Sequence, residues 1–509
     1  MDVPSSNRLC PVAPSPQLRE RLEDAVRAAR VATGLPADGP GALLREPRRL
    51  GFNDGVLRPP SAYGPGTDRT TVRAAAHARA PLRGQVRVLV VLVDFSDRPF
   101  TVDTSRFEEL FFSTGSLVTG SVKEYFTDVS GGLVDVVGQV VGPLRMQETL
   151  EWYANGSFGI GNPTGDPRAQ FLAEHAAREA DGVTDLRPYD NDADGYVDAF
   201  VVVHAGRGGE ETGDPGDLWS HKWVLPQEYE ADGTKVFAYL TIPEDAKLGV
   251  SAHELGHLLF GWPDLYDTDD TSAGIGDWCL MAGGSWNAGG DVPAHPSAWC
   301  KAQQGWVAVE NVTADGPASL PGVQASRTVH RLWTGGADSQ EYFLLEHRRR
   351  TGFDSELPGE GLLIWHVDDA QEDNSDEQHH LVGLLQADGL RELEQDVNRG
   401  DGGDCYPGSS DNRLLSGATT PASTSYAGQD TGVVVAAIAV EQDVVRTVLS
   451  VSGTVPPDSS EGADGDLRRT VERLQAQVER LSAAVAAAGS ALGGAPGGLS
   501  SAWSRRPTT

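Results

Sequence analysis

The pattern of apolar and polar positions changes along the chain and divides it into regions. An apolar run at 86–93, interrupted only by Arg87, is typical of a strand buried on both faces. Further apolar runs predict strands at 133–141 and 199–204, and helical spacing predicts helices at 121–126 and 168–180. We therefore expect mixed α and β structure, of the α+β class, over residues 85–310.

Residues 311–453 carry a pattern of short strands with few helical stretches. Glycine, aspartate and serine separate the apolar segments, as in domains whose strands are joined by tight turns. The expected strands lie at 341–346, 361–367, 381–386, 432–440 and 444–451. This region is predicted to be a β-rich domain of the sandwich or barrel type.

The most regular periodicity follows a linker at 454–466 that is rich in Pro, Ser, Gly and Asp. From 467 to 492, apolar residues recur in alternating steps of four and three, with Val at one core position and Leu at the other. This heptad pattern predicts a coiled-coil helix that either forms a homo-oligomer or packs onto the protein's own body. Residues 493–509 are expected to be a disordered tail.

Residues 1–84 have the composition of an accessory leader or a propeptide. A helical pattern at 18–31 precedes stretches rich in Pro and Gly, and a flexible leader is the alternative interpretation. Residues 1–7 lack the basic start and the apolar stretch of a secretory signal. An intracellular protein, a start further upstream and another export route therefore all stay open.

Charge and composition narrow the classes of partner. The chain of 509 residues has a net charge of −32, which argues against nucleic acid as the main partner because phosphate binding needs clustered Lys and Arg. No apolar run is long enough for a membrane span. The 4 cysteines are too few for a disulfide scaffold.

A His-Glu-x-x-His motif carries the candidate chemistry. On a helix, His253 and His257 share one face and can bind one Zn²⁺, while Glu254 can take a proton from a water on the metal and pass it to a leaving amine. A surface helix with two histidines is the alternative. The apolar residues around the motif predict a buried helix, and buried histidines beside a buried glutamate need a partner such as a metal.

A catalytic zinc also needs a third protein ligand, and two aspartates are placed to supply it. Gly261 can end the helix and turn the chain back, and Asp264 and Asp267 follow. Downstream, Met281 lies in a turn-rich segment, and a methionine turn beneath the zinc marks the metzincin group of peptidases.

The string HELGHLLFGWPDLYD at 253–267, with 278–286, resembles the immune inhibitor A family of secreted bacterial zinc metallopeptidases. Shorter stretches that also resemble it lie at 92–97, 121–126, 219–223 and 361–368, so the likeness covers roughly residues 85–450. The resemblance implies a metzincin-like zinc peptidase that uses calcium, acts on proteins or peptides and is secreted, although a cytoplasmic location stays open.

The same resemblance implies His253, His257 and an aspartate as zinc ligands, with Glu254 as the base. The family pattern is His-Glu-x-x-His-x-x-Gly-x-x-Asp, and here the glycine and the aspartate each stand one residue later. One inserted residue aligns the string and favours Asp264 as the third ligand, with Asp267 as the alternative.

A second metal site is predicted at 190–198. Asp190, Asp192, Asp194 and Asp198 take the acidic positions of an EF-hand loop around a central glycine, and the Tyr196 carbonyl takes the seventh position. The twelfth position lacks the required glutamate, so we expect a related calcium loop with a structural role. A solvated acidic turn is the alternative, and the acidic stretch 368–377 is a weaker calcium candidate.

Several isolated residues support hypotheses of their own. Cys10 in the leader could bind the zinc and hold a latent form. Cys279 and Cys300 could form a bridge or stay buried thiols. His221 is expected either to line the cleft or to pack in the core, and the pair at 379–380 is expected to be exposed.

The leading functional interpretation is a zinc endopeptidase that hydrolyses peptide bonds with a metal-activated water. The alternative from another class is a catalytically inactive, calcium-stabilised extracellular scaffold that oligomerises through its coiled coil. A third interpretation, an intracellular zinc hydrolase with a non-protein substrate, is kept open by the absence of a visible signal peptide.

Overall fold

The computed structural model describes residues 10–33, 80–161 and 165–454, all within one compact unit that ends at Thr454. The predicted coiled coil at 467–492, the tail at 493–509 and nearly all of the linker lie outside the described residues. The structure is mixed α and β, as expected from the sequence. The division of the chain at residue 310 stays a prediction.

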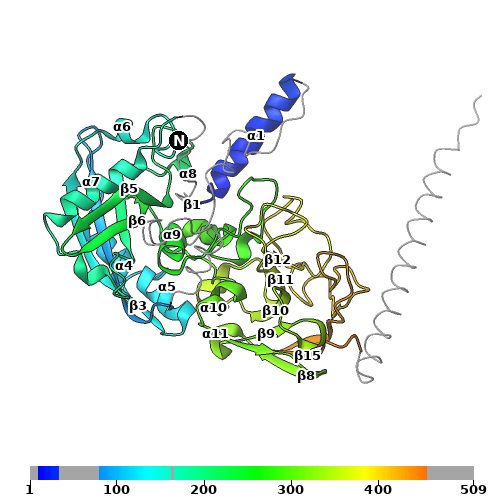
Figure 1. The fold of residues 1–509 in the computed structure, drawn as a ribbon. Helices are drawn as coiled ribbons and strands as arrows, with labels where there is room; N and C mark the ends of the chain where they lie inside the picture. The colour runs from blue at the N-terminus through cyan, green and yellow to red at the C-terminus, as the bar shows by residue number, and fades with distance from the viewer. Residues whose placement is uncertain (1–9, 34–79, 162–164, 455–509) are drawn as a thin grey trace, which may run out of the picture. The chain divides into compact units, whose positions relative to one another are not determined.

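The first sheet has six strands in the order β1-β5-β6-β4-β2-β3 (Figure 1). The strands are β1 (Cys10–Pro11), β2 (Gly84–Asp94), β3 (Val134–Arg145), β4 (Phe200–His204), β5 (His221–Ala231) and β6 (Thr234–Pro243). Strands β2, β3, β4 and β6 are parallel to one another, whereas β5 is antiparallel to β6. The apolar run of β2 is buried because this strand lies between β3 and β4.

The strands and helices predicted for 85–310 are present, but the sequence analysis missed the β5–β6 hairpin. Its turn is Asp232-Gly233, and both residues have positive φ angles of 56° and 84°. An Asp-Gly pair between two apolar stretches is a strong hairpin signal, because a two-residue turn needs positive φ at both positions. This signal was present in the sequence and was overlooked.

Helices pack against this sheet and connect its strands. The α-helices are α1 (Pro16–Thr33), α4 (Ser105–Phe112), α5 (Val122–Ser130), α6 (Leu150–Ala154), α7 (Ala169–Asp181), α8 (Gly209–Thr212), α9 (Leu248–Phe260), α10 (Ala298–Gln303) and α11 (Val323–Ser326). Short 3₁₀ helices are η3 (Arg187–Tyr189), η4 (Gly276–Trp278), η5 (Gly283–Gly290), η6 (Thr334–Gly336) and η7 (Gly352–Glu356). None of the helices in the described ranges combines the length and the apolar character that crossing a membrane requires.

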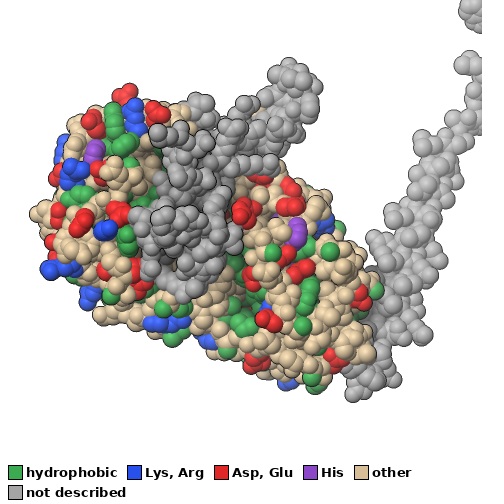
Figure 2. All heavy atoms as spheres, in the orientation of Figure 1, with side chains coloured by type: hydrophobic (Ala, Val, Ile, Leu, Met, Phe, Trp, Pro, Cys, Tyr) green, Lys and Arg blue, Asp and Glu red, His purple; other side chains and the backbone are tan. Residues whose placement is uncertain are grey.

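The β-rich region forms two further sheets, in the orders β12-β11-β10-β9-β7 and β13-β14-β15-β8. Their strands are β7 (Ala308–Asn311), β8 (Gly316–Pro321), β9 (Thr328–Leu332), β10 (Glu341–Arg348), β11 (Gly361–Asp368), β12 (Val382–Leu384), β13 (Leu414–Leu415), β14 (Val434–Glu441) and β15 (Val444–Ser450). All five strands predicted in this region are present. On the face of the molecule in Figure 2, acidic and basic side chains are interspersed over the described surface.

Strand β10 faces two different hydrophobic cores. Phe343 and Leu345 pack in a core shared with Leu415 and Leu449 of the third sheet. Leu344, which points to the opposite face, belongs to the core of the first sheet. Because side chains alternate along a strand, β10 contributes one face to each of the two cores. The two regions therefore pack directly against each other.

A network of buried charges stabilises strand β10 between the two cores. Arg348 on β10 donates from Nε to Asp354 Oδ2 at 2.8 Å and from Nη1 to Glu346 Oε1 at 3.2 Å. Lys301 on α10 donates to Glu346 Oε2 at 3.0 Å, and the Trp365 indole donates to Glu346 Oε1 at 3.0 Å. All four charged side chains are fully buried or nearly so, so each depends on its partners for the stabilisation that water would otherwise give.

Removing one member of this network should destabilise the fold strongly. We expect Asp354→Asn to lower the free energy of unfolding by about 3–5 kcal/mol, because Arg348 is then left with too little negative charge in the core. Urea denaturation of the whole chain measures the change. Asp338→Asn is the matched control, since its ion pair with Arg331 has a 94% exposed carboxylate, and it should leave stability nearly unchanged.

The same network gives a pH dependence. Burial alone would raise the pKa of Asp354, but the charges of Arg348 and His295 and the hydrogen bonds from Arg348 outweigh it and hold the pKa well below its usual range. The stabilisation is therefore fully present above the unfolded pKa of about 3.9 and is lost as the pH falls below it. The stability difference between wild type and Asp354→Asn should shrink from pH 7 toward pH 3, and a constant difference would contradict this explanation.

Candidate metal centre

Helix α9 carries the His-Glu-x-x-His motif through the interior, and all of its residues are buried. Two glycines allow this close packing. A Cβ on Gly249 would lie 1.9 Å from the Ser285 carbonyl oxygen, and one on Gly256 would lie 2.7 Å from Met281 Sδ. The helix ends at Gly261, whose φ of 64° turns the chain back under the motif, as the sequence analysis expected.

Backbone carbonyls fix the orientation of both histidines. His253 Nδ1 lies 2.9 Å from the Leu280 oxygen, and His257 Nδ1 lies 2.6 Å from the Trp262 oxygen. A carbonyl can only accept a hydrogen bond, so each Nδ1 carries the proton. Burial lowers the pKa of His257, which favours the neutral ring. In the neutral form each Nε2 is an unprotonated lone pair, which is the form that binds a metal.

Asp264 completes a triangle with these two nitrogens. The two Nε2 atoms are 3.1 Å apart, and Asp264 Oδ1 lies 3.2 Å from His253 Nε2 and 3.1 Å from His257 Nε2. Ligands bound to one tetrahedral zinc at 2.0–2.1 Å lie about 3.3 Å from one another. Three lone-pair atoms at this separation in a buried place repel one another unless a cation lies between them. The residues present therefore fit a zinc ion.

Glu254 lies beside this triangle without a hydrogen bond of its own among the described residues. Its side chain is fully buried, and neither Oε1 nor Oε2 has a hydrogen-bond partner. Burial first, and then the negative charges of Asp264 and Glu210, raise the pKa of Glu254 well above its usual value. A buried carboxylate with both oxygens open is costly, which indicates that it serves a molecule bound at the centre.

Asp267, the alternative third ligand, lies in a different cluster. Its carboxylate groups with those of Asp269 and Glu377, the last of which belongs to the acidic stretch 368–377. Burial raises the pKa of Asp267 to about 6. The structure thus brings Asp264, and not Asp267, next to the two histidines.

The loop that contains Met281 forms the floor of the centre. Met281 is fully buried, and its carbonyl accepts a hydrogen bond from Leu265 N at 2.7 Å, one residue after Asp264. The neighbouring Leu280 carbonyl holds His253, as described above. This one loop therefore orients His253 and also holds the chain next to Asp264.

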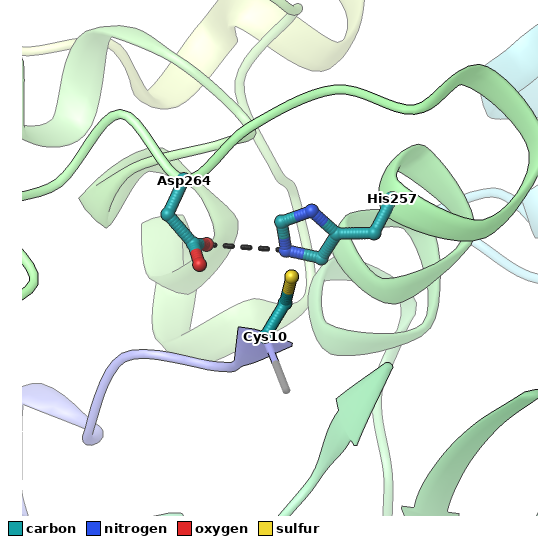
Figure 3. Close-up of side chains that lie close together, drawn as sticks. All are labelled: Cys10, His257 and Asp264. Atoms are coloured by element: carbon teal, nitrogen blue, oxygen red, sulfur yellow. Dashed lines mark ion pairs between the residues drawn. The ribbon is translucent and has the colours of Figure 1, made fainter. Parts of the chain in front are cut away.

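Cys10 reaches the centre from the N-terminal part of the chain. The ligand atoms of Cys10, His257 and Asp264 all lie within 4.8 Å of one another. Figure 3 shows the Cys10 sulfur pointing toward the His257 ring and the Asp264 carboxylate. Strand β1, which contains Cys10, pairs with the edge strand β5.

Other residues singled out in the sequence lie away from the centre or have structural roles. His221 is a core histidine with hydrogen bonds to the Trp219 carbonyl at 2.6 Å and the Tyr239 hydroxyl at 2.9 Å. Cys279 and Cys300 are buried thiols and form no disulfide. The expectation of an exposed pair at 379–380 is wrong: His380 is only 3% exposed, and His379 is partly buried with its Nε2 at 2.7 Å from Asp368 Oδ2.

The predicted calcium loop gathers three of its four acids. The carboxylates of Asp190, Asp192 and Asp194 have oxygens within 4.8 Å of one another. Asp190 also accepts hydrogen bonds from the backbone N–H groups of Asp194 and Gly195, each at 3.0 Å. Asp198 is buried, and its Oδ2 accepts from Asn191 N at 2.5 Å.

The centre also contains groups that the sequence analysis missed. Tyr266 donates from its hydroxyl to the Pro11 carbonyl at 2.5 Å. Trp219 and Trp286 donate from their indoles to the carbonyls of the next two leader residues. Tyrosine and tryptophan donors follow no sequence motif, so their role is recognised only from the folded position of residues 11–13.

Comparison with known proteins agrees with this geometry. Residues 78–310 match the family described as immune inhibitor A peptidase M6, catalytic domain. The pre-pro-metalloprotease PrtV of Vibrio cholerae serotype O1 (strain M66-2) is 30% identical over 271 residues, which cover 42% of this chain and 29% of the relative. Immune inhibitor A of Bacillus thuringiensis subsp. alesti is 32% identical over 224 residues, which cover 38% of this chain and 31% of the relative.

The chain thus spans about a third of the length of these curated relatives. The family match covers strands β2 to β6 of the first sheet, helix α9 and the centre built on it. The resemblance drawn from the sequence is confirmed over residues 78–310, which are similar to the catalytic domain of the immune inhibitor A metallopeptidases.

Proposed function

We propose that this protein is a zinc-dependent endopeptidase that hydrolyses peptide bonds in proteins. His253, His257 and Asp264 are the zinc ligands, and Glu254 is the general base. The observation that carries the proposal is the triangle of unprotonated ligand atoms at 3.1–3.2 Å beside a buried carboxylate with no hydrogen-bond partner. A non-catalytic scaffold would have no use for that carboxylate, whose burial only destabilises the fold.

The proposed fold of the catalytic domain is metzincin-like. Support comes from the methionine loop beneath helix α9, where Met281 Sδ lies against Gly256. Further support comes from the antiparallel strand β5, which only the two-residue strand β1 separates from the edge of the sheet, since a strand in this position can take up an extended peptide as an additional strand. The β-rich region packed behind this loop is the second domain of the proposal.

The reaction would divide its tasks among residues of this chain. A zinc ion held by the three ligands supplies Lewis-acid chemistry and makes a water acidic. Glu254 would accept that water's proton and deliver it to the leaving amine. Because no hydrogen bond competes for its oxygens, both are available to the water. The Leu280 and Trp262 carbonyls keep both imidazoles in the ligand orientation throughout.

Substrates are proteins or peptides, and we propose that the protein is secreted, following the family resemblance. Calcium at Asp190, Asp192 and Asp194 is part of the proposal, with the Tyr196 carbonyl and Asp198 as the remaining candidate ligands. Three carboxylates gathered in one turn support it, because they would repel one another without a cation. A homo-oligomer formed through residues 467–492 stays a prediction.

The base is tested by Glu254→Gln. We expect casein cleavage to fall by about 10²–10⁴-fold, the usual contribution of a general base, while the variant keeps one zinc per chain. Cleavage and zinc content are measured with and without a chelator, before and after removal of residues 1–84. Zinc-loaded wild type that cleaves nothing after this trimming would favour the scaffold interpretation.

The third ligand is tested by comparing Asp264→Asn with Asp267→Asn. Asp264→Asn should lose zinc at a chelator concentration that leaves wild type loaded, because the neutral amide is a much weaker ligand. Asp267→Asn should keep its zinc, since that carboxylate lies in another cluster. The opposite order of zinc loss in a metal-titration assay would make Asp267 the ligand.

Calcium is tested by thermal unfolding. We expect added calcium to raise the melting temperature of wild type, because a ligand that binds only the folded state stabilises it by about 2.7 kcal/mol at 100 times its dissociation constant. Asp192→Asn should reduce this increase. Asp181→Asn, outside the loop, should retain it, and equal increases in both variants would place the calcium elsewhere.

A further inference from the structure

The loop between β12 and β13 folds back on itself and brings three aspartates together. The carboxylates of Asp388, Asp401 and Asp404 each have an oxygen within 4.8 Å of the others. Backbone hydrogen bonds join the two arms of the loop: Asp388 N donates to the Gly403 oxygen at 3.1 Å, and Ala387 N donates to the Asp404 oxygen at 2.9 Å. The backbone therefore holds the three acids in one place, although Asp388 is distant from the other two in sequence.

A glycine allows the carboxylates to approach one another. A Cβ on Gly403 would lie 2.2 Å from Asp388 Oδ2 and 2.9 Å from Asp401 Oδ1, so any side chain there would occupy the space in which the two carboxylates meet. Asp388 and Asp401 are partly exposed, whereas Asp404 is fully buried. The cluster therefore lies at the surface, with its innermost acid in the core.

Asp404 contains an oxygen that the fold leaves unsatisfied. Its Oδ2 accepts hydrogen bonds from the Trp278 indole at 3.0 Å and from Asp401 N at 2.9 Å. Its Oδ1 is buried and has no hydrogen-bond partner among the described residues. Because a buried carboxylate oxygen without a partner destabilises a fold, this atom indicates that something binds at the cluster.

A proton on Asp404 does not remove this cost. Burial first, and then the charges of Asp401 and Asp388, raise the pKa of Asp404 to about 7. A protonated carboxyl group must donate its O–H, yet Oδ1 has no acceptor in the described part of the chain and Oδ2 already faces two N–H donors. A cation among the three carboxylates satisfies Oδ1 and also cancels their repulsion.

The donor set favours a hard divalent cation. All three side chains of the cluster offer carboxylate oxygens, which are the ligands of Ca²⁺ and Mg²⁺. The neighbouring Cys405 thiol donates to the Glu360 carbonyl at 3.1 Å, and burial raises its pKa to about 12, so it stays protonated and does not attract a soft metal. Calcium fits better than magnesium, because it accepts irregular geometry and takes further carbonyl and water oxygens.

We propose that Asp388, Asp401 and Asp404 bind a structural calcium ion. Each carboxylate supplies one ligand oxygen and one negative charge, and water or backbone oxygens take the other positions. This site is separate from the calcium loop at 190–198. It does not rest on the proposed peptidase activity, and the readouts that test it need no catalysis.

The ion stabilises the floor of the metal centre. Asp404 holds the Trp278 indole, and the loop that contains Met281 follows directly after Trp278. Beside it, Asp277 N donates to the Arg399 oxygen at 2.7 Å, which is a second contact between this loop and the aspartate cluster's own loop. A calcium ion that makes the cluster rigid therefore also fixes the start of the loop beneath the metal centre.

Terbium luminescence tests the site, because Tb³⁺ replaces Ca²⁺ among oxygen ligands and emits when a nearby tryptophan is excited. The full chain is stripped of calcium with a calcium-selective chelator, titrated with Tb³⁺ and excited selectively through tryptophan. We expect emission that saturates and that excess calcium abolishes. Asp404→Asn should lose this emission. Trp278→Phe should lose it too, because the Trp278 indole lies 3.0 Å from Asp404 Oδ2.

Two control variants locate the signal. Asp192→Asn lies in the loop at 190–198, and Asp411→Asn changes a 64% exposed carboxylate outside the cluster. Both should keep the emission. Wild type without emission, emission that survives in Asp404→Asn or Trp278→Phe, or emission that is lost in Asp192→Asn would overturn the proposal.

Thermal unfolding distinguishes a bound ion from a carboxylate that only accepts hydrogen bonds. Without calcium, Asp404→Asn should melt at the same temperature as wild type or higher, because the variant removes a repelling buried charge. With calcium the order should reverse, because the ion at this site stabilises only wild type, whereas the loop at 190–198 contributes equally to both proteins. A variant that melts below wild type by the same interval in both conditions would contradict the proposal.

Discussion

The structure is organised around three lone-pair atoms that meet in the buried interior. Two of them are imidazole Nε2 atoms that carry no proton in the neutral ring, because the proton then lies on Nδ1, which donates to a carbonyl at 2.9 Å in His253 and 2.6 Å in His257. The third is a carboxylate oxygen with no donor of its own. With neutral imidazoles no arrangement of protons satisfies all three atoms, which supports the proposal that a cation binds between them.

Placing those atoms requires support from distant parts of the chain. The loop from Leu280 to Met281 orients His253, and Trp278, two residues before Leu280, accepts a hydrogen bond on its carbonyl from Arg348 Nη1 at 3.4 Å. Arg348 belongs to the buried charge network on β10, whose alternate faces line two cores. The β-rich region thus helps to hold the metal centre in place, because it makes this loop rigid. The β-rich region and the region of the first sheet each need the other to be well packed.

Strand β5 connects the centre to the segment that begins at Cys10. An exposed edge presents unpaired backbone groups, which proteins usually cover. Here a short strand of the same chain covers part of it and presents its first side chain to the ligand triangle. The indole and hydroxyl groups that bind residues 11–13 contact only their backbone carbonyls, so the same surface suits any extended peptide. The segment that covers strand β5 is therefore also the segment that reaches the metal centre.

The sequence by itself determined the local elements and the chemistry of the motif. The apolar run of β2, the helical spacing of α7 and the strands of the β-rich region were predictable because each depends on neighbours in the chain. The spacing of His253 and His257 placed both on one helix face for the same reason. Tertiary structure decided the rest: which aspartate meets the histidines depends on how the chain turns after Gly261, and Asp267 differs from Asp264 only in where that turn leaves it. The position of Cys10 depends on pairing across more than 200 residues with β5, and no local pattern encodes such a contact.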